Sequence, residues 1–205
     1  MDVIVLDPKE QARLIQQRRD ARSDHHDEVW DGDYVLTPLP DNEHQEILWN
    51  LTLGFRRMVE ARGHGAARPG ANITDQVDDW ERNYRCCDVV VHTRETIARV
   101  REDHCLGGPD FIVEIVSRHD RSRRKIDFYG KVGVRELLLV DRYPWALELY
   151  RLGAAGTLEL AGTSMVGKPG ALSSRVLPVS FRLEPGEERP QIVVEHADGL
   201  PTWSA

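Results

Sequence analysis

Two acidic residues lie within apolar segments of the sequence, where an ionised carboxylate is costly. Glu114 interrupts the run FIVEIV (residues 111–116), and Asp88 interrupts the run RCCDVVVH (residues 85–92). Both runs are short and rich in β-branched residues, so they predict buried strands. A buried carboxylate needs an ion pair or a bound cation to offset the loss of hydration. These two positions are therefore the first candidates for chemistry.

A basic segment follows the strand that contains Glu114. It covers residues 121–125, is predicted to be helical and ends in Lys125. A second apolar strand, residues 137–140, comes next and ends at Asp141. This order predicts a strand–helix–strand unit with a carboxylate in the first strand and a lysine on the helix behind it.

Two carboxylates and a lysine suit a site for a hard cation. Mg²⁺ prefers oxygen ligands, commonly one or two carboxylates, and keeps several of its waters. Such an ion lowers the pKa of a bound water and stabilises charge on a scissile phosphate. A nearby lysine could position or deprotonate that water, or neutralise developing charge. A second interpretation stays open, in which Asp88 and Glu114 are structural and pair with arginines.

The composition restricts the class of protein. At 205 residues with 40% hydrophobic and 30% charged residues, the chain fits one globular domain. The net charge of −7 argues against a general nucleic-acid coat protein, so phosphate binding would need a local basic patch or a metal. The three cysteines include an adjacent pair and no Cys-x-x-Cys spacing, which disfavours zinc and indicates a reducing cytoplasm. No membrane span or secretory signal is expected.

Several local patterns predict individual elements. Residues 7–10, Asp-Pro-Lys-Glu, predict a capped helix start with a helix to about residue 22. Asp31-Gly32 predicts a tight hairpin. Asn42 is predicted to cap a long helix that ends near residue 62. Residues 63–70 are expected to form a loop, and residues 71–74 a short strand.

An ordered set of short motifs covers residues 25–185. It consists of the segment PDFIVEIVS with the downstream lysine, tyrosine and GVRELLLVD, preceded by a Glu-x-x-Asp-Gly hairpin, a proline-rich bend and a His-Gln pair. In this chain the motifs are Glu28 with Asp31-Gly32, Pro38–Pro40, His44-Gln45, the segment from Pro109 to Ser117, Lys125, Tyr129, Gly133-Val134, Glu136 and Asp141. The set resembles a large bacterial family of restriction endonucleases within the PD-(D/E)XK nuclease superfamily.

The resemblance implies an α/β (α+β) restriction-endonuclease-like fold, with a central mixed β-sheet flanked by helices and additional β-hairpins. It also implies a Mg²⁺ or Mn²⁺ site and hydrolysis of DNA phosphodiester bonds. Asp88 and Glu114 match the acidic residues of the two motifs and would hold the metal. Two positions depart from the superfamily pattern: Cys87 replaces the usual proline, and Val116 replaces the usual lysine. Lys125 matches a lysine that has migrated to the following helix.

Other residues are weaker candidates. Glu28 and His44 could line the pocket, although His44 could instead support its helix N-terminus. Tyr129 shares a helix face with Lys125, but an aromatic residue there is expected to pack in the core. Asp120 is predicted to cap the helix that carries Lys125. Three arginines could contact DNA phosphates or lie in water: Arg118, Arg121 and Arg124.

We therefore expect a single nuclease-like domain over residues 1–205, with a core of about 25–185 and an appended N-terminal helix and C-terminal strand. The predicted function is that of a cytoplasmic, metal-dependent DNA endonuclease with catalytic residues Asp88, Glu114 and Lys125. The changes at Cys87 and Val116 favour an alternative, a catalytically inactive nuclease-fold module for nucleic-acid binding or assembly. A homodimer is also predicted, because two active sites suit cleavage of both strands.

Overall fold

The computed structural model describes residues 3–60, 63–118, 121–168, 170–197 and 201–205. Within these residues the strands form a ten-stranded sheet and a four-stranded sheet. The strands of the first sheet are β1 (Val3–Val5), β2 (Glu28–Trp30), β3 (Asp33–Leu36), β4 (Gly65–Thr74), β5 (Tyr84–Thr93), β6 (Cys105–Leu106), β7 (Phe111–Ile115), β8 (Glu136–Arg142), β9 (Trp145–Leu152) and β10 (Leu158–Met165). The second sheet contains β11 (Leu172–Ser173), β12 (Val179–Glu184), β13 (Gln191–His196) and β14 (Trp203–Ser204).

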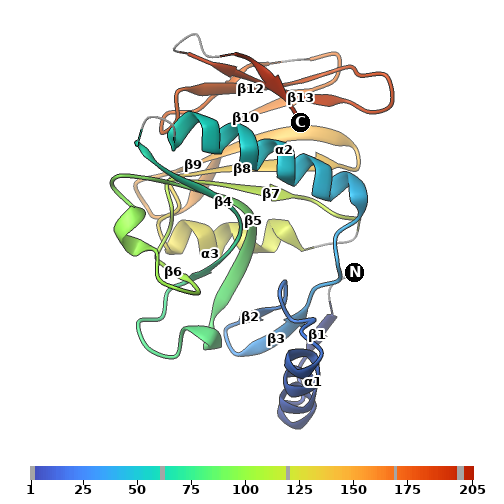
Figure 1. Ribbon diagram of the computed structural model, residues 1–205, viewed down its shortest axis with the longest axis vertical. Coiled ribbons are helices and arrows are strands. Elements are labelled where there is room, and N and C mark those ends of the chain that lie inside the picture. Colours follow the sequence, from blue (N-terminus) through green and yellow to red (C-terminus); the bar gives the residue numbers. More distant parts are fainter. Residues whose placement is uncertain (1–2, 61–62, 119–120, 169, 198–200) are drawn as a thin grey trace.

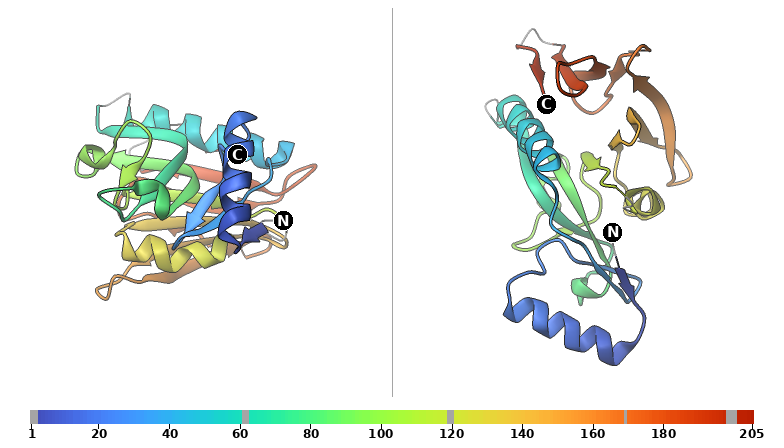
Figure 2. Two further views of the ribbon diagram at one scale, coloured as in Figure 1. Left: turned by 90° about the horizontal axis from the view of Figure 1, so that it is seen from below. Right: turned by 90° about the vertical axis from the view of Figure 1, so that its right-hand side faces the viewer.

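The α-helices are α1 (Pro8–Asp20), α2 (Asn42–Val59) and α3 (Ile126–Lys131), and the 3₁₀ helices are η1 (Trp80–Arg82), η2 (Ile97–Arg99) and η3 (Ser122–Lys125). Figures 1 and 2 show α1 and the second sheet at opposite ends of the molecule. None of the helices in the described ranges is long and apolar enough to cross a lipid bilayer.

The first sheet is mixed, as the family resemblance implied. Its main path runs β1-β3-β2-β5-β7-β8-β9-β10, and β7 and β8 are parallel whereas their outer neighbours β5 and β9 pair antiparallel with them. Helices α2 and α3 lie on opposite sides of β5 and β7 (Figure 2, right). The expected fold class, a central mixed sheet with helices on its faces, is confirmed.

Helix α2 and the second sheet cover one face of the first sheet. The buried stripe of α2 includes Ile47, Leu51 and Phe55, which recur at helical spacing. The ring of Phe55 lies 5.6 Å from Phe111 of β7 and 6.2 Å from Phe181 of β12, measured between centroids. This packing fixes α2 against the strands that carry the acidic residues.

The predicted strand–helix–strand unit is present and builds the other face. Strands β7 and β8 pair in parallel register from Phe111↔Glu136 to Ile115↔Val140, and η3 with α3 forms the crossover. The segment that holds Lys125 begins as a 3₁₀ turn and continues as an α-helix, so the lysine stands at the junction. The predicted cap residue Asp120 lies outside the described residues.

Two local predictions agree with the structure. Asp7 caps α1, because its side chain accepts the backbone N–H groups of Lys9 and Glu10, although α1 ends at Asp20. The hairpin between β2 and β3 is also present, and its turn places Asp31 at φ 51° and Gly32 at φ 97°. Left-handed conformations at both positions explain why this turn has the sequence Asp-Gly.

Two other local predictions were wrong. The cap of α2 is Asp41, whose side chain accepts the His44 N–H at 2.8 Å, and the helix ends at Val59. Residues 65–70 form the first part of strand β4 instead of a loop, because they pair with β5. A Cβ atom at residue 65 would lie 1.9 Å from the His92 carbonyl oxygen, so this glycine permits close strand approach.

Candidate active site

The two acidic residues lie where β5 and β7 separate. Antiparallel pairing between these strands runs from Val91↔Phe111 to Val89↔Val113, and in that register the next pair would be Asp88 and Glu114. Instead, the Asp88 side chain accepts the Ile115 N–H through Oδ2 at 2.6 Å. A carboxylate thus takes the place of a backbone carbonyl, and the sheet opens at this point.

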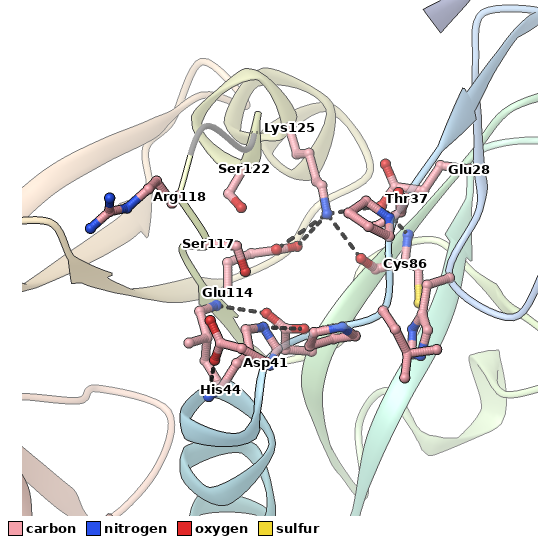
Figure 3. Close-up of a pocket in the computed structure, with 16 residues that line it drawn as sticks. Glu28, Thr37, Asp41, His44, Cys86, Glu114, Ser117, Arg118, Ser122 and Lys125 are labelled. Carbon is pink, nitrogen blue, oxygen red and sulfur yellow. Dashed lines mark hydrogen bonds and ion pairs between the residues drawn. The ribbon is translucent and has the colours of Figure 1, made fainter. Parts of the chain in front are cut away.

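A cavity of about 230 Å³ occupies the opening. Its walls come from β2, the segment before α2, the start of α2, β5, β7 and η3 (Figure 3). Six of the residues singled out in the sequence line it: Glu28, His44, Asp88, Glu114, Arg118 and Lys125. Residues far apart in the sequence therefore meet in one pocket.

Lys125 extends from η3 toward the acidic residues (Figure 3). Its Nζ lies 2.8 Å from Oε1 of Glu28 and 3.2 Å from each carboxylate oxygen of Glu114. It also donates to the Cys86 carbonyl oxygen at 3.0 Å. The Tyr129 hydroxyl, one helical turn beyond Lys125, donates to Glu114 Oε1. The helix thus presents an amine and a hydroxyl to one carboxylate.

Glu114 has an unusual affinity for protons. Burial raises its pKa to about 8, and the negative charges on Asp88 and Glu28 act in the same direction. The Lys125 charge and the Tyr129 hydrogen bond favour the ionised form and limit this rise. A carboxyl in this state is sensitive to any additional positive charge in the cavity.

Asp88 behaves in the opposite way. Burial alone would raise the pKa of Asp88, but the hydrogen bond and charge of His44, followed by the Lys125 charge and the Ile115 N–H, lower the pKa below its ordinary value. The His44 Nε2 atom lies 3.2 Å from Asp88 Oδ1. Asp88 is therefore ionised at neutral pH, and the nearby His44 and Lys125 stabilise its negative charge.

The position of His44 depends on the N-terminus of α2. Asp41 caps the helix through the His44 N–H, and Arg142 at the end of β8 contacts Asp41 Oδ1 at 2.9 Å and Oδ2 at 3.1 Å. Arg142 also contacts Glu43 Oε2 at 2.8 Å and the Val116 carbonyl at 3.1 Å. One buried guanidinium thereby ties the first turn of α2 to the ends of β7 and β8.

The ion-pair partners distinguish between the two interpretations of the acidic residues. In the part of the chain that the structure describes, Asp88 pairs with His44 and Glu114 pairs with Lys125, and neither pairs with an arginine. The interpretation in which arginines neutralise both carboxylates does not describe this arrangement.

The remaining predicted residues take different positions. Tyr129 is fully buried, packs in the core beside Phe128 and also binds Glu114, so it has a packing role and a polar contact. Arg118 lies at the edge of the cavity, with its guanidinium carbon 4.9 Å from the centre of the Tyr143 ring. Arg121 and Arg124 do not line the cavity.

Sequence patterns had not singled out several residues of the cavity wall. They include His26, Thr37, Asp41, Cys86 and Ser122. Most lie within a few residues in sequence of a residue that was selected, such as Cys86, two residues before Asp88 in β5. That closeness was the signal available, but the direction in which each side chain points depends on the folded backbone.

The donor atoms of the cavity suit a hard divalent cation. Among the described residues, no group of three or more His, Cys, Asp or Glu side chains is arranged to hold a metal ion. The cavity offers the carboxylate oxygens of Asp88 and Glu114 instead. Mg²⁺ is commonly bound by two carboxylates, with water molecules in its other coordination positions, so Asp88 and Glu114 fit this type of ion.

Comparisons with known proteins identify a family and a similar fold. A family model named Uma2, with the description "Putative restriction endonuclease", matches residues 10–186. The fold is similar to a crystal structure described as a "putative nuclease belonging to DUF820" from Anabaena variabilis ATCC 29413. That similarity has a TM-score of 0.56 at 19% sequence identity, and covers 72% of this chain and 80% of the other. No curated protein matches the chain.

Proposed function

Because the chain belongs to the Uma2 restriction endonuclease family, we propose that it is a metal-dependent endonuclease that hydrolyses phosphodiester bonds in DNA. The observation that supports this function is the convergence of Asp88, Glu114 and Lys125 on one cavity. Fold similarity alone would not suffice, since activity depends on the site.

In this proposal Asp88 and Glu114 supply oxygen ligands for Mg²⁺ or Mn²⁺. A bound ion of this kind would acidify a water molecule and stabilise negative charge on the phosphate. His44 orients the Asp88 carboxylate through its Nε2 contact, and Tyr129 orients Glu114 through its hydroxyl. Such supporting contacts fix the direction of the ligand oxygens before substrate arrives.

Lys125 acts as a cation. Burial alone would lower its pKa, but the charges on Glu114, Glu28 and Asp88 outweigh burial and raise the pKa well above its ordinary value. The amine is therefore protonated at neutral pH and cannot accept a proton from water. It instead donates hydrogen bonds and offsets charge that develops on the phosphate.

The reaction adds one water across a P–O bond. The water oxygen bonds to phosphorus in line with the departing bridging oxygen, the bond to that oxygen breaks, and the departing oxygen takes up a proton. Arg118, at the edge of the cavity, is placed to contact a flanking phosphate. Arg121 and Arg124 would contact phosphates farther away. With a net charge of −7, binding to DNA phosphates would depend on such local arginines or on a bound metal.

The test uses the purified full chain and supercoiled plasmid DNA with Mg²⁺, Mn²⁺ or EDTA. We expect nicking with a metal, no nicking in EDTA, and a rate reduced by about 10³-fold or more in Asp88→Asn and Glu114→Gln. Glu187→Gln, an exposed carboxylate change, is the matched control. Absence of nicking with both metals on a broad substrate set would contradict the proposal. Nicking that persists in both cavity variants would contradict it as well.

A further inference from the structure

One large apolar side chain is displayed to solvent at the cavity. Leu39 is 83% exposed, the highest value among the large hydrophobic residues that the structure describes. Its two neighbours are also apolar, and Pro38, Leu39 and Pro40 all line the same cavity as Asp88 and Glu114. A molecule bound at the two acidic residues would therefore have this apolar segment close beside it.

The segment that carries Leu39 is held at both ends. At one end, the Thr37 N–H donates to Oδ1 of buried Asp27 at 3.0 Å. At the other end, Asp41 caps α2 and is bound by Arg142. The two prolines restrict their own φ angles, and Pro40 also favours an extended backbone at Leu39. The exposed side chain is thus presented on a pre-organised support.

Polar and cationic groups line the same cavity as this apolar segment. In Figure 3, Arg118 and Thr37 lie on opposite sides of Glu114, and Lys125 approaches from the helix above it. The cavity is therefore lined both by cationic groups suited to phosphate, Arg118 and Lys125, and by the apolar segment of residues 38–40. A nucleic acid offers these two surfaces together, because a charged phosphate and the apolar faces of the bases belong to each nucleotide.

We infer that Leu39 is an apolar wedge that packs against the bases beside the scissile phosphate, so the preferred substrate is DNA in which those bases are unstacked. Leucine side chains inserted between base steps are a known way for proteins to unstack and kink a duplex. A rigid support suits this role, because a flexible one would yield instead of displacing a base. This inference rests on the proposed nuclease function.

The test compares wild type, Leu39→Ser, Leu39→Met and the control Val77→Ser, in the full chain. Val77 is 78% exposed and does not line the cavity, so Val77→Ser matches the loss of apolar surface elsewhere. Each protein is assayed on a duplex that the wild type cuts and on the same strand alone. A duplex with 2-aminopurine beside the cut site reports unstacking as a rise in fluorescence on binding.

We expect Leu39→Ser to lower the ratio of duplex to single-strand kcat/KM by about tenfold, and to abolish the fluorescence rise. Leu39→Met should restore both, and Val77→Ser should match the wild type. An unchanged ratio in Leu39→Ser, or an equal loss on both substrates, would overturn the inference. A change of oligomeric state in Leu39→Ser by light scattering would also overturn it, because Leu39 would then be a subunit contact.

The two proposals can fail separately. If wild type cuts neither substrate, the nuclease function fails, and the fluorescence signal on a mixed set of duplexes still decides the wedge. A rise in fluorescence that Leu39→Ser abolishes would support a base-contacting role without cleavage. If the wild type gives no rise in fluorescence, the wedge is overturned. If wild type cuts DNA but the Leu39 variants behave like Val77→Ser, the nuclease function stands and the wedge fails.

Discussion

The Nζ atom of Lys125 lies closer to Glu28, at 2.8 Å from Oε1, than to either carboxylate oxygen of Glu114, at 3.2 Å. Glu28 is fixed in turn by the Cys86 N–H at 2.8 Å and the Trp30 indole N–H at 2.5 Å. The β2–β3 hairpin therefore determines where the amine stands in the cavity. Lys125 is shared between a carboxylate that positions it and a carboxylate at the proposed metal site.

This sharing predicts the effect of Glu28→Gln. Loss of the Glu28 charge should let the amine shift toward Glu114, away from its place beside the phosphate. We expect kcat to fall by between about tenfold and a hundredfold, as for small misplacements of a catalytic group. KM should change little, because the Glu28 carboxylate is engaged by Lys125, the Cys86 N–H and the Trp30 indole and acts through the amine.

Steady-state kinetics on a mapped DNA substrate provide the measurement, with Glu187→Gln as the surface control. A raised KM with an unchanged kcat would mean that Glu28 contacts substrate instead of positioning Lys125.

The pKa of Glu114 predicts a pH dependence of stability in the metal-free protein. Folded Glu114 holds its proton up to about pH 8, whereas the unfolded chain releases it near the ordinary value of 4.5. Between these values the folded state binds more protons, so the free energy of unfolding falls as pH rises. The slope from this group is at most about 1.4 kcal/mol per pH unit.

Urea denaturation in EDTA from pH 5 to pH 8 tests this expectation. Wild type should lose stability relative to Glu114→Gln across that range, because all other titrating groups are common to both proteins. Parallel stability curves would show that the folded Glu114 carboxyl titrates normally.

His44 provides a third prediction, for metal affinity. Its Nε2 contact with Asp88 orients a proposed ligand and lowers that ligand's pKa. His44→Ala should therefore weaken Mn²⁺ binding by about 10–100-fold, the usual range for groups that support metal ligands. Isothermal titration calorimetry at neutral pH gives the affinity, and His25→Ala, an exposed change outside the cavity, is the control. Equal affinity in His44→Ala and wild type would assign His44 to the support of α2 alone.

Local sequence patterns were sufficient for the strand–helix–strand unit and for the β2–β3 turn. The run around Glu114 is apolar on both sides, and a parallel strand buried on both faces requires that composition. Asp31-Gly32 matches a turn that needs positive φ at both positions. In both cases the information lies within a few neighbouring residues.

Features that depend on distant contacts were not predictable in the same way. Residues 65–70 contain glycine and proline, but pairing with β5 overrides their preference for a loop. Asp41 and Asn42 are both good cap residues, and the backbone decides between them. Glu28 was only a weak candidate, because its partner Lys125 lies far away in the sequence and no local pattern links the two residues. Arg142 was not selected at all.

Arg142 is the subject of the last prediction. Its side chain is fully buried and bridges Asp41 and Glu43 at the start of α2, although these two acids are 54% and 36% exposed. Water can therefore solvate both carboxylates when the arginine is absent. We expect Arg142→Met to lower the free energy of unfolding by about 2 kcal/mol, less than the loss of a fully buried pair. Asp41→Asn should cost about 1 kcal/mol, because asparagine is also a good helix cap and only the charge is lost. Urea denaturation of both single variants and the double variant gives the coupling between them. If the single losses simply add in the double variant, Arg142 does not act through Asp41, and its anchoring of His44 would have to come from its contact with Glu43 or Val116.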